Sequence, residues 1–106
     1  TFFWFLDNIL YMEFDFFNFK TPRDIQLEIA KNVRLRRKEM KMTQEQFAKV
    51  TGVSLGSIKR FENTGEISLL SLSKIAIILG RSDEMFNLFS QRHYNSIEEI
   101  LNEHTK

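Results

Sequence analysis

The stretch MTQEQFAKVTGVSLGSIKRFEN, residues 42–63, predicts two helices joined by a tight turn at Gly52. Thr43 and Gln46 have the spacing of a capping box, so the first helix is expected to begin directly after Thr43. Gly52 stands where the chain must reverse, because a left-handed conformation costs a residue with a side chain about 1 kcal/mol or more. Ser54 is then expected to cap the second helix.

The second helix has an apolar side and an outward side. Ile58 and Phe61 are spaced as i and i+3, so both are expected to face the core. On the first helix Phe47 and Ala48 begin the buried side, and Ala48 is small where the two helices cross. The outward positions of the second helix are the candidate contact surface, and they are Leu55, Gly56, Ser57, Lys59 and Arg60.

Around these residues the sequence resembles the lambda-repressor/Cro type of helix-turn-helix domain, the XRE family. The resemblance covers about residues 25–89 and rests on the run V-R-L-R-R-K-x-M-x-M-T-Q-x-Q-F-A-x-x-T-G-V-S-x-x-x-I-x-x-F-E-N. An apolar helix around Ile75 and Leu79 follows this run. The resemblance implies an all-α, five-helix fold in a sequence-specific regulator, expected to be a repressor, that binds double-stranded DNA.

In such a motif the second helix enters the major groove, where its N-terminal residues meet base edges. By the resemblance, the base-contacting positions are Leu55, Gly56 and Arg60. Arg60 can pair bidentately with guanine, Leu55 can contact a thymine methyl group, and Gly56 permits a close approach. The positions that face phosphates or flank the contact are Gln44, Ser54, Ser57, Lys59 and Asn63.

The charged residues of this region can also have roles other than DNA contact. A solvated helix face is the alternative explanation for Lys59 and Arg60. Arg37 and Glu62 occupy positions at which relatives form an ion pair between the first and third helices. A structural role is therefore expected for Arg37 first.

The uneven distribution of charge favours a nucleic-acid partner. The chain of 106 residues has a net charge of only +1. Residues 23–60 contain ten Lys or Arg and four Asp or Glu, a net charge of +6, whereas residues 61–106 carry −3. A basic half is expected where one face meets phosphates. A helical protein-interaction module without DNA binding is a further alternative, and the basic half argues against it.

The sequence offers little for catalysis or metal binding. It has no cysteine, which excludes disulfides and thiolate ligands and fits the cytoplasm. His93 and His104 are the only histidines, and no spaced carboxylates accompany them. The serines at 54, 68, 82 and 96 stand at helix starts, so capping explains them without a nucleophile. We expect no enzymatic activity, no cofactor and no metal.

Further helices are expected on both sides of the motif. Thr21-Pro22-x-Asp24 predicts the start of a helix that runs to about residue 40. Its predicted buried stripe is Ile25, Ile29 and Val33. Relatives usually have glycine at position 41, so Lys41 either adopts the left-handed conformation or the helix ends differently.

After the motif, Ser68 is expected to cap a helix that Gly80 ends. Its predicted inward side consists of Leu69, Leu72, Ile75, Ala76 and Leu79. Ser82 is expected to cap a fifth helix over residues 83–89. A Ser96-x-x-Glu99 capping box predicts a short last helix with Ile97, Ile100 and Leu101.

These patterns divide the chain into an aromatic arm (1–20), a helix-turn-helix domain (21–90) and a tail (91–106). The arm holds Trp4 and seven of the eleven phenylalanines. It is too short and too often interrupted by acids to span a bilayer, and it lacks the features of a signal peptide, so no membrane contact is expected. Met12 is an alternative natural start, which would make residues 1–11 either the product of an upstream reading frame or an added, non-native segment.

Two protein partners are also predicted. A homodimer is expected because useful specificity needs two half-sites, with either the fifth helix (Met85, Phe86, Phe89) or the last helix as its surface. Alternatively, Phe86 and Phe89 merely close the core. The stretches GVSLGSIKRFENTGEISLLSLSKIAIILG, MFNLF and SIEEI resemble the DNA-binding antitoxins of Hip-type kinase toxins. That resemblance implies a toxin kinase as partner and control of its own promoter.

Overall fold

The computed structural model describes residues 20–92 and 101–102. Within those residues five helices follow one another and no strand occurs. They are α2 (Pro22–Glu39), α3 (Gln44–Thr51), α4 (Leu55–Thr64), α5 (Leu69–Ile78) and α6 (Ser82–Phe86). The predicted all-α, five-helix class is confirmed. The aromatic arm up to residue 19 and most of the predicted last helix lie outside the described residues, although Leu101 and Asn102 are helical.

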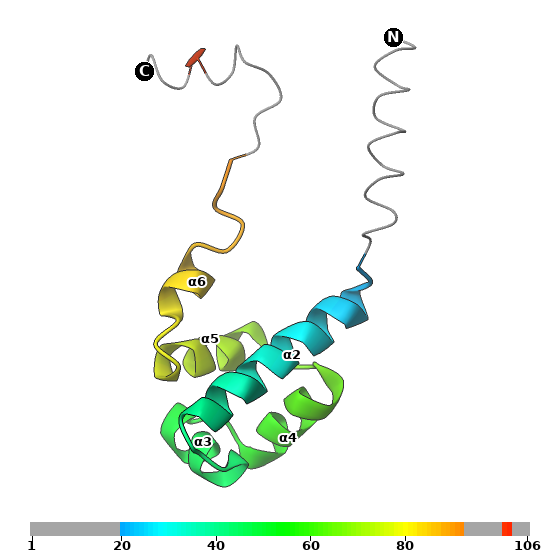
Figure 1. Cartoon of the computed structure of the whole chain (residues 1–106), viewed down its shortest axis with the longest axis vertical. Coiled ribbons are helices and arrows are strands. Elements are labelled where there is room, and N and C mark those ends of the chain that lie inside the picture. The colour runs from blue at the N-terminus through cyan, green and yellow to red at the C-terminus, as the bar shows by residue number, and fades with distance from the viewer. Residues whose placement is uncertain (1–19, 93–100, 103–106) are drawn as a thin grey trace.

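The long helix α2 crosses α4, while α3 packs against both α4 and α5 (Figure 1). In that view α3 and α4 lie together at the lower end of the domain. The short α6 packs on α5, on the other side of the molecule from α4. The two helices of the central motif therefore form one end of the domain.

Two helices begin with reciprocal capping boxes, of which the sequence predicts the one at Thr43 and Gln46 and, at Thr21, only the start of the helix. The amide of Asp24 donates to Thr21 Oγ1 and the amide of Thr21 donates to Asp24 Oδ2, both over 3.0 Å. At α3 the amide of Gln46 donates to Thr43 Oγ1 over 3.1 Å, and the amide of Thr43 donates to Gln46 Oε1 over 2.9 Å. The hydrogen bond from the amide of Thr21 to the carboxylate is the larger cause that holds the pKa of Asp24 below its ordinary value, and the side chain of Thr21 adds to it.

The turn between α2 and α3 settles the alternatives for position 41. Lys41 adopts the left-handed conformation with φ of +57°, one residue after the C-cap Met40. Its amide donates to the carbonyl of Lys38 over 2.9 Å, so the end of α2 is closed by a 3₁₀-type bond. The left-handed conformation costs lysine about 1 kcal/mol relative to glycine.

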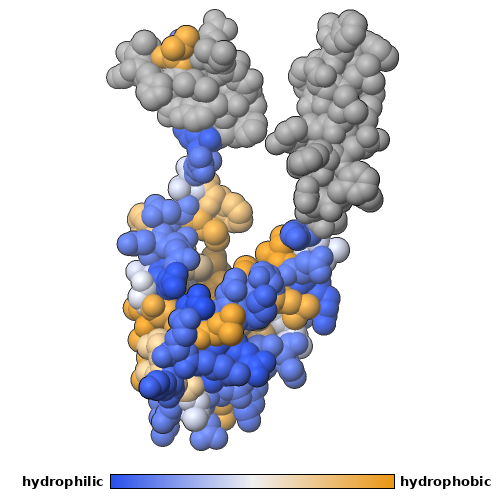
Figure 2. All heavy atoms as spheres, viewed as in Figure 1, coloured by the Kyte–Doolittle hydropathy of each residue, from blue (hydrophilic) through white to orange (hydrophobic). Residues whose placement is uncertain are grey.

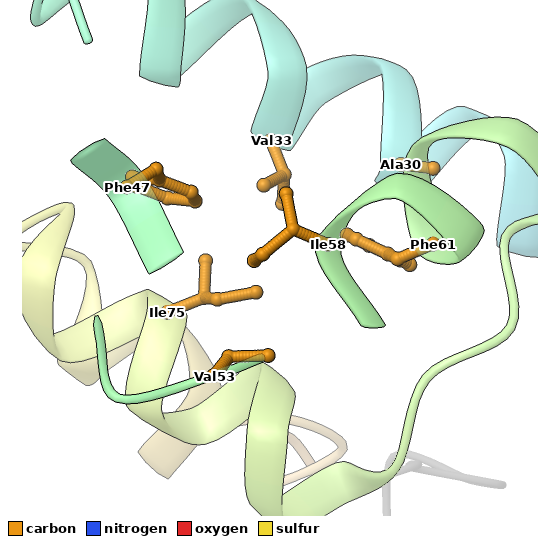
Figure 3. Packing of buried hydrophobic residues seen from close by; sticks show 7 residues of the cluster. All are labelled: Ala30, Val33, Phe47, Val53, Ile58, Phe61 and Ile75. Carbon is orange, nitrogen blue, oxygen red and sulfur yellow. The ribbon is translucent and has the colours of Figure 1, made fainter. Parts of the chain in front are cut away.

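The core is a single cluster to which four helices contribute (Figure 3). Ile58 and Phe61 of α4 are buried as predicted, with Phe47 of α3 beside them. The cluster consists of Ala30, Val33, Phe47, Val53, Ile58, Phe61 and Ile75. Since α4 supplies two of its largest side chains, the core fixes which side of α4 faces outward.

The predicted buried stripe of α2 is right at Val33 and wrong at Ile25 and Ile29. Ile25 and Ile29 are 51% and 39% exposed, while Ala30, Val33 and Arg37 are buried. The buried side of α2 is the side that α4 covers. The end of α4 lies so close to α2 that a Cβ on Gly65 would stand 2.7 Å from Gln26 Cβ. Tertiary packing, rather than the apolar pattern, therefore determines the rotation of α2.

Three predictions for the last helices also need correction. Ile75 and Ala76 of α5 are buried, but Leu69 at its first position is exposed. Ser82 does not cap α6, because it is the first residue of that helix and Arg81 stands at the N-cap without a side-chain hydrogen bond. The helix ends at Phe86 rather than at Phe89, whose φ is +60°.

Candidate nucleic-acid interface

The buried side chain of Thr51 holds the turn between α3 and α4 in place. No sequence pattern indicated this role. Its hydroxyl donates to the carbonyl of Phe47 over 2.7 Å and accepts from the amide of Val53 over 3.2 Å. Gly52 has φ of +76°, as predicted, and Val53 enters the core. These contacts hold the start of α4 in one orientation relative to α3.

The face of α4 opposite the core is polar and lies at the end of the domain. Ser54 caps the helix, since its Oγ accepts from the amide of Ser57 over 3.2 Å. The two hydroxyls are also 2.8 Å apart and hydrogen-bonded. The surface around this end is largely hydrophilic (Figure 2). The exposed residues of the helix and its cap are Ser54, Gly56, Ser57, Lys59, Arg60 and Asn63, whereas Leu55 is half-buried.

Gly56 lies on this face without a packing reason for being glycine. Within the described residues, a Cβ at this position would have no heavy atom within 4 Å apart from its chain neighbours and the nearby backbone of α4. The helix can therefore approach a flat or convex partner closely at Gly56, because no side chain separates the backbone from it.

Arg60 is exposed and contacts an acidic residue that the sequence analysis did not include. Its Nε lies 3.0 Å and its Nη2 2.5 Å from Glu66 Oε2, in the connection between α4 and α5. The pair spans six residues across the end of the helix, so helical periodicity alone gives no signal for it. The guanidinium is held at the surface instead of lying against the core.

Arg37 and Glu62 lie in a buried bidentate ion pair, the arrangement that the resemblance implies. Arg37 Nε donates to Glu62 Oε2 and Nη2 donates to Oε1, both over 2.9 Å. Arg37 Nη1 donates to the carbonyl of Met42 over 2.8 Å. The two side chains are 8% and 6% exposed. This pair joins α2, the following turn and α4 into one rigid unit.

Gln44 is bonded to the same carboxylate. Its Nε2 donates to Glu62 Oε1 over 3.1 Å, and Arg34 Nε lies 3.9 Å from that oxygen. A polar hollow of about 590 Å³ opens here, between the start of α3 and the last turn of α4. Its lining residues are Arg34, Arg37, Thr43, Gln44, Lys59, Glu62 and Asn63. With three basic residues and one acid, this lining attracts anions.

Comparison with known protein families decides the assignment. A family model described as helix-turn-helix, of the XRE type, matches residues 33–86, about half of the chain. The chain belongs to the helix-turn-helix family. No curated protein and no solved structure matches the chain.

As a helix-turn-helix protein the chain is a DNA-binding regulator of transcription, with α3 and α4 as the helices of the motif. The matched residues include the capped start of α3, the turn at Gly52 and all of α4. The structure brings together Gln44, Lys59, Asn63 and the Arg37–Glu62 pair around the polar hollow. It sets Arg60 apart, on a second shallow hollow with Ser57 and Glu66.

The described residues hold neither a metal-ligand cluster nor a membrane-spanning helix. Among residues 20–92 and 101–102 no three His, Cys, Asp or Glu side chains gather in a way that could hold a metal ion. Within these residues, too, no helix is both long and apolar enough to cross a membrane.

Proposed function

We propose that this protein binds double-stranded DNA sequence-specifically by placing α4 in the major groove. The observation that carries the proposal is the fixed orientation of α4. Ile58 and Phe61 anchor one side in the core, while Gly56, Lys59 and Arg60 occupy the exposed side. A helix presented in this way fits the major groove of B-DNA, which is about 12 Å wide.

Base contacts are proposed for Leu55, Gly56 and Arg60. Arg60 is the donor among them, because a guanidinium can donate to guanine O6 and N7 together. Leu55 is half-buried, which leaves part of its side chain for a thymine methyl group. Gly56 lets the backbone approach the base edges, since it adds no side chain on that face.

Phosphate contacts are proposed for the residues around the start of α3 and both ends of α4. These are Gln44, Ser54, Ser57, Lys59 and Asn63. The capped N-terminus of α3 contributes a positive dipole end next to the basic lining of the polar hollow. Gln44 has one remaining amide N–H for a phosphate after its bond to Glu62.

The proposal is tested by selecting duplexes from a random-sequence pool with the full chain and titrating the selected duplex by fluorescence anisotropy. We expect one recurrent sequence and an affinity that falls steeply with salt, because basic residues displace counterions from phosphates. A pool that stays random after repeated selection, with no retention of duplex DNA at low salt, would contradict the proposal.

Replacing Arg60 by alanine is expected to weaken binding to the selected duplex by about 1–3 kcal/mol and to relax preference at one base pair. Lys59→Ala is the matched control. Because Lys59 is proposed to face phosphates, its loss should weaken binding to all duplexes alike and lower the salt dependence. An Arg60→Ala protein that binds the selected duplex as tightly as the parent would refute the role of Arg60.

We also propose that the chain binds DNA as a homodimer. Phe86 and Phe89 are 88% and 94% exposed, so they do not close the core of the described domain. Met85 beside them is half-buried, and Leu101 is also exposed. Ile97 and Ile100 lie outside the described residues. Analytical ultracentrifugation of the protein on its selected duplex should give two chains per duplex, and a strict one-to-one complex would contradict the dimer.

Repression is the regulatory outcome that we propose, because a dimer bound over a promoter occupies DNA that polymerase needs. A reporter placed behind the selected sequence should lose expression when the protein is present, and increased expression would contradict repression. The comparisons add no support for a Hip-type kinase toxin as partner or for a module without DNA binding. Neither alternative is part of the proposal.

A further inference from the structure

The contact between Arg60 and Glu66 uses only one edge of the guanidinium. Nε and Nη2 both donate to Glu66 Oε2, over 3.0 and 2.5 Å. A guanidinium has five N–H groups, one on Nε and two on each terminal nitrogen. The side edge is therefore taken, while the end edge, formed by Nη1 and the second N–H of Nη2, makes no hydrogen bond within the described residues.

The two residues before Glu66, Thr64 and Gly65, hold its backbone in place. Thr64 Oγ1 donates to the carbonyl of Arg60 over 2.7 Å and accepts from the amide of Glu66 over 3.2 Å. Gly65 between them has φ of +79° and packs directly against Gln26 of α2. The connection after α4 is thus tied to α4 by Thr64 and to α2 by Gly65. It holds the start of the Glu66 side chain at a fixed distance from Arg60.

The end edge of an arginine can bind guanine bidentately. Two parallel N–H groups on Nη1 and Nη2 match the spacing of guanine O6 and N7. An arginine whose side edge is already bonded has fewer orientations left for its end edge. Less conformational freedom is then lost when that end binds a base.

We propose that Glu66 is a positioning residue for base recognition: it holds the side edge of Arg60 so that the end edge is presented to a guanine in the major groove. This inference rests on the proposed function and adds to it a residue outside α4. Glu66 does not contact the base. It acts on the choice of base through Arg60.

The negative charge of Glu66 also allows the opposite effect, a weakening of DNA binding. The experiment has to distinguish this effect from the positioning of Arg60. A carboxylate near DNA repels phosphates, so Glu66 could instead hold Arg60 away from the duplex and weaken all binding. The geometry favours positioning, because the carboxylate lies on the side of the guanidinium and leaves its end uncovered. Both side chains are more than half exposed, so in water the pair adds little to folding stability. When DNA excludes water from the pair, the same contact strengthens.

The experiment measures the preference for guanine at the DNA base pair that Arg60 contacts. Full-length parent, Glu66→Ala, Glu66→Gln, Arg60→Ala and the Arg60→Ala/Glu66→Ala double variant are titrated against the parent's selected duplex. They are also titrated against the three duplexes that change only that base pair. Glu28→Ala is the matched control, because Glu28 pairs with Lys31 in another exposed ion pair, on α2. Thermal unfolding of each variant verifies that the fold is kept.

Positioning predicts that Glu66→Ala lowers the preference for guanine at that base pair by about three- to tenfold. Preference at the other base pairs and binding to unselected duplex should stay within about twofold of the parent. Glu66→Gln retains an acceptor oxygen and should give an intermediate loss. Glu66→Ala should change nothing further once Arg60 is alanine, and Glu28→Ala should behave as the parent.

Two results would overturn the inference. One is a Glu66→Ala protein with unchanged guanine preference, and the other is a variant that binds every duplex more tightly, which would show Glu66 to be a competitor of DNA. If the parent selects no sequence, the proposed function itself fails, and the inference fails with it. A parent that selects a sequence, together with a neutral Glu66→Ala, contradicts the inference alone.

Discussion

Replacing Glu62 by alanine is expected to lower the free energy of unfolding by about 3–5 kcal/mol. The substitution leaves Nε and Nη2 of Arg37 buried without an acceptor, and it also removes the partner of Gln44. An unpaired buried charge costs far more than the pair itself contributes to stability. Urea unfolding followed by circular dichroism measures the loss.

Two controls test whether the loss of stability comes from the burial of the Arg37–Glu62 pair. Glu28→Ala removes the acid of an exposed pair with Lys31 on α2, and should cost at most about 1 kcal/mol. The Arg37→Ala/Glu62→Ala double variant should lose clearly less than both single losses added together, because neither charge is then left unpaired. Strictly additive losses would contradict the coupling that the structure shows between these two side chains.

Gly65→Ala is expected to lower the free energy of unfolding by about 2–4 kcal/mol. Two costs combine here. The left-handed conformation is unfavourable for alanine, and the new Cβ would stand 2.7 Å from Gln26 Cβ and 2.8 Å from the Gln26 carbonyl carbon. Because part of that contact is backbone, α2 and the end of α4 must separate to relieve it.

Gly52→Ala is the matched comparison. Its φ of +76° is close to that of Gly65, but a Cβ there would meet nothing within 4 Å. Only the conformational cost of about 1 kcal/mol then remains. If urea unfolding gives the same loss of free energy for both variants, the close approach of α4 to α2 contributes nothing to the cost of Gly65→Ala.

The central motif could be predicted from the sequence because its signals are local. The capping box of Thr43 and Gln46, the left-handed Gly52 and the cap Ser54 depend on neighbouring residues alone, and all three are present. The inward side of α4 followed from the spacing of Ile58 and Phe61. Short-range geometry was sufficient for these features.

Features that depend on the packing of separate helices could not be predicted in this way. The apolar spacing of Ile25 and Ile29 suggested a buried stripe, but the crossing by α4 buries Ala30 and Arg37 instead. Glu66 is separated from Arg60 by a helix end and a turn, so only the folded chain brings them together. The buried pair of Arg37 and Glu62 was expected from family resemblance and not from any local pattern.

The most direct test of the central claim is amide chemical-shift mapping of the isotope-labelled full chain with its selected duplex. If α4 lies in the major groove, the largest shifts should fall on residues 54–63, with a second group at residues 43–46 at the start of α3. Amides of α5 and of the α2 face that carries Ile25 should change little. Shifts concentrated on α5 and α6, with α4 unperturbed, would contradict the account.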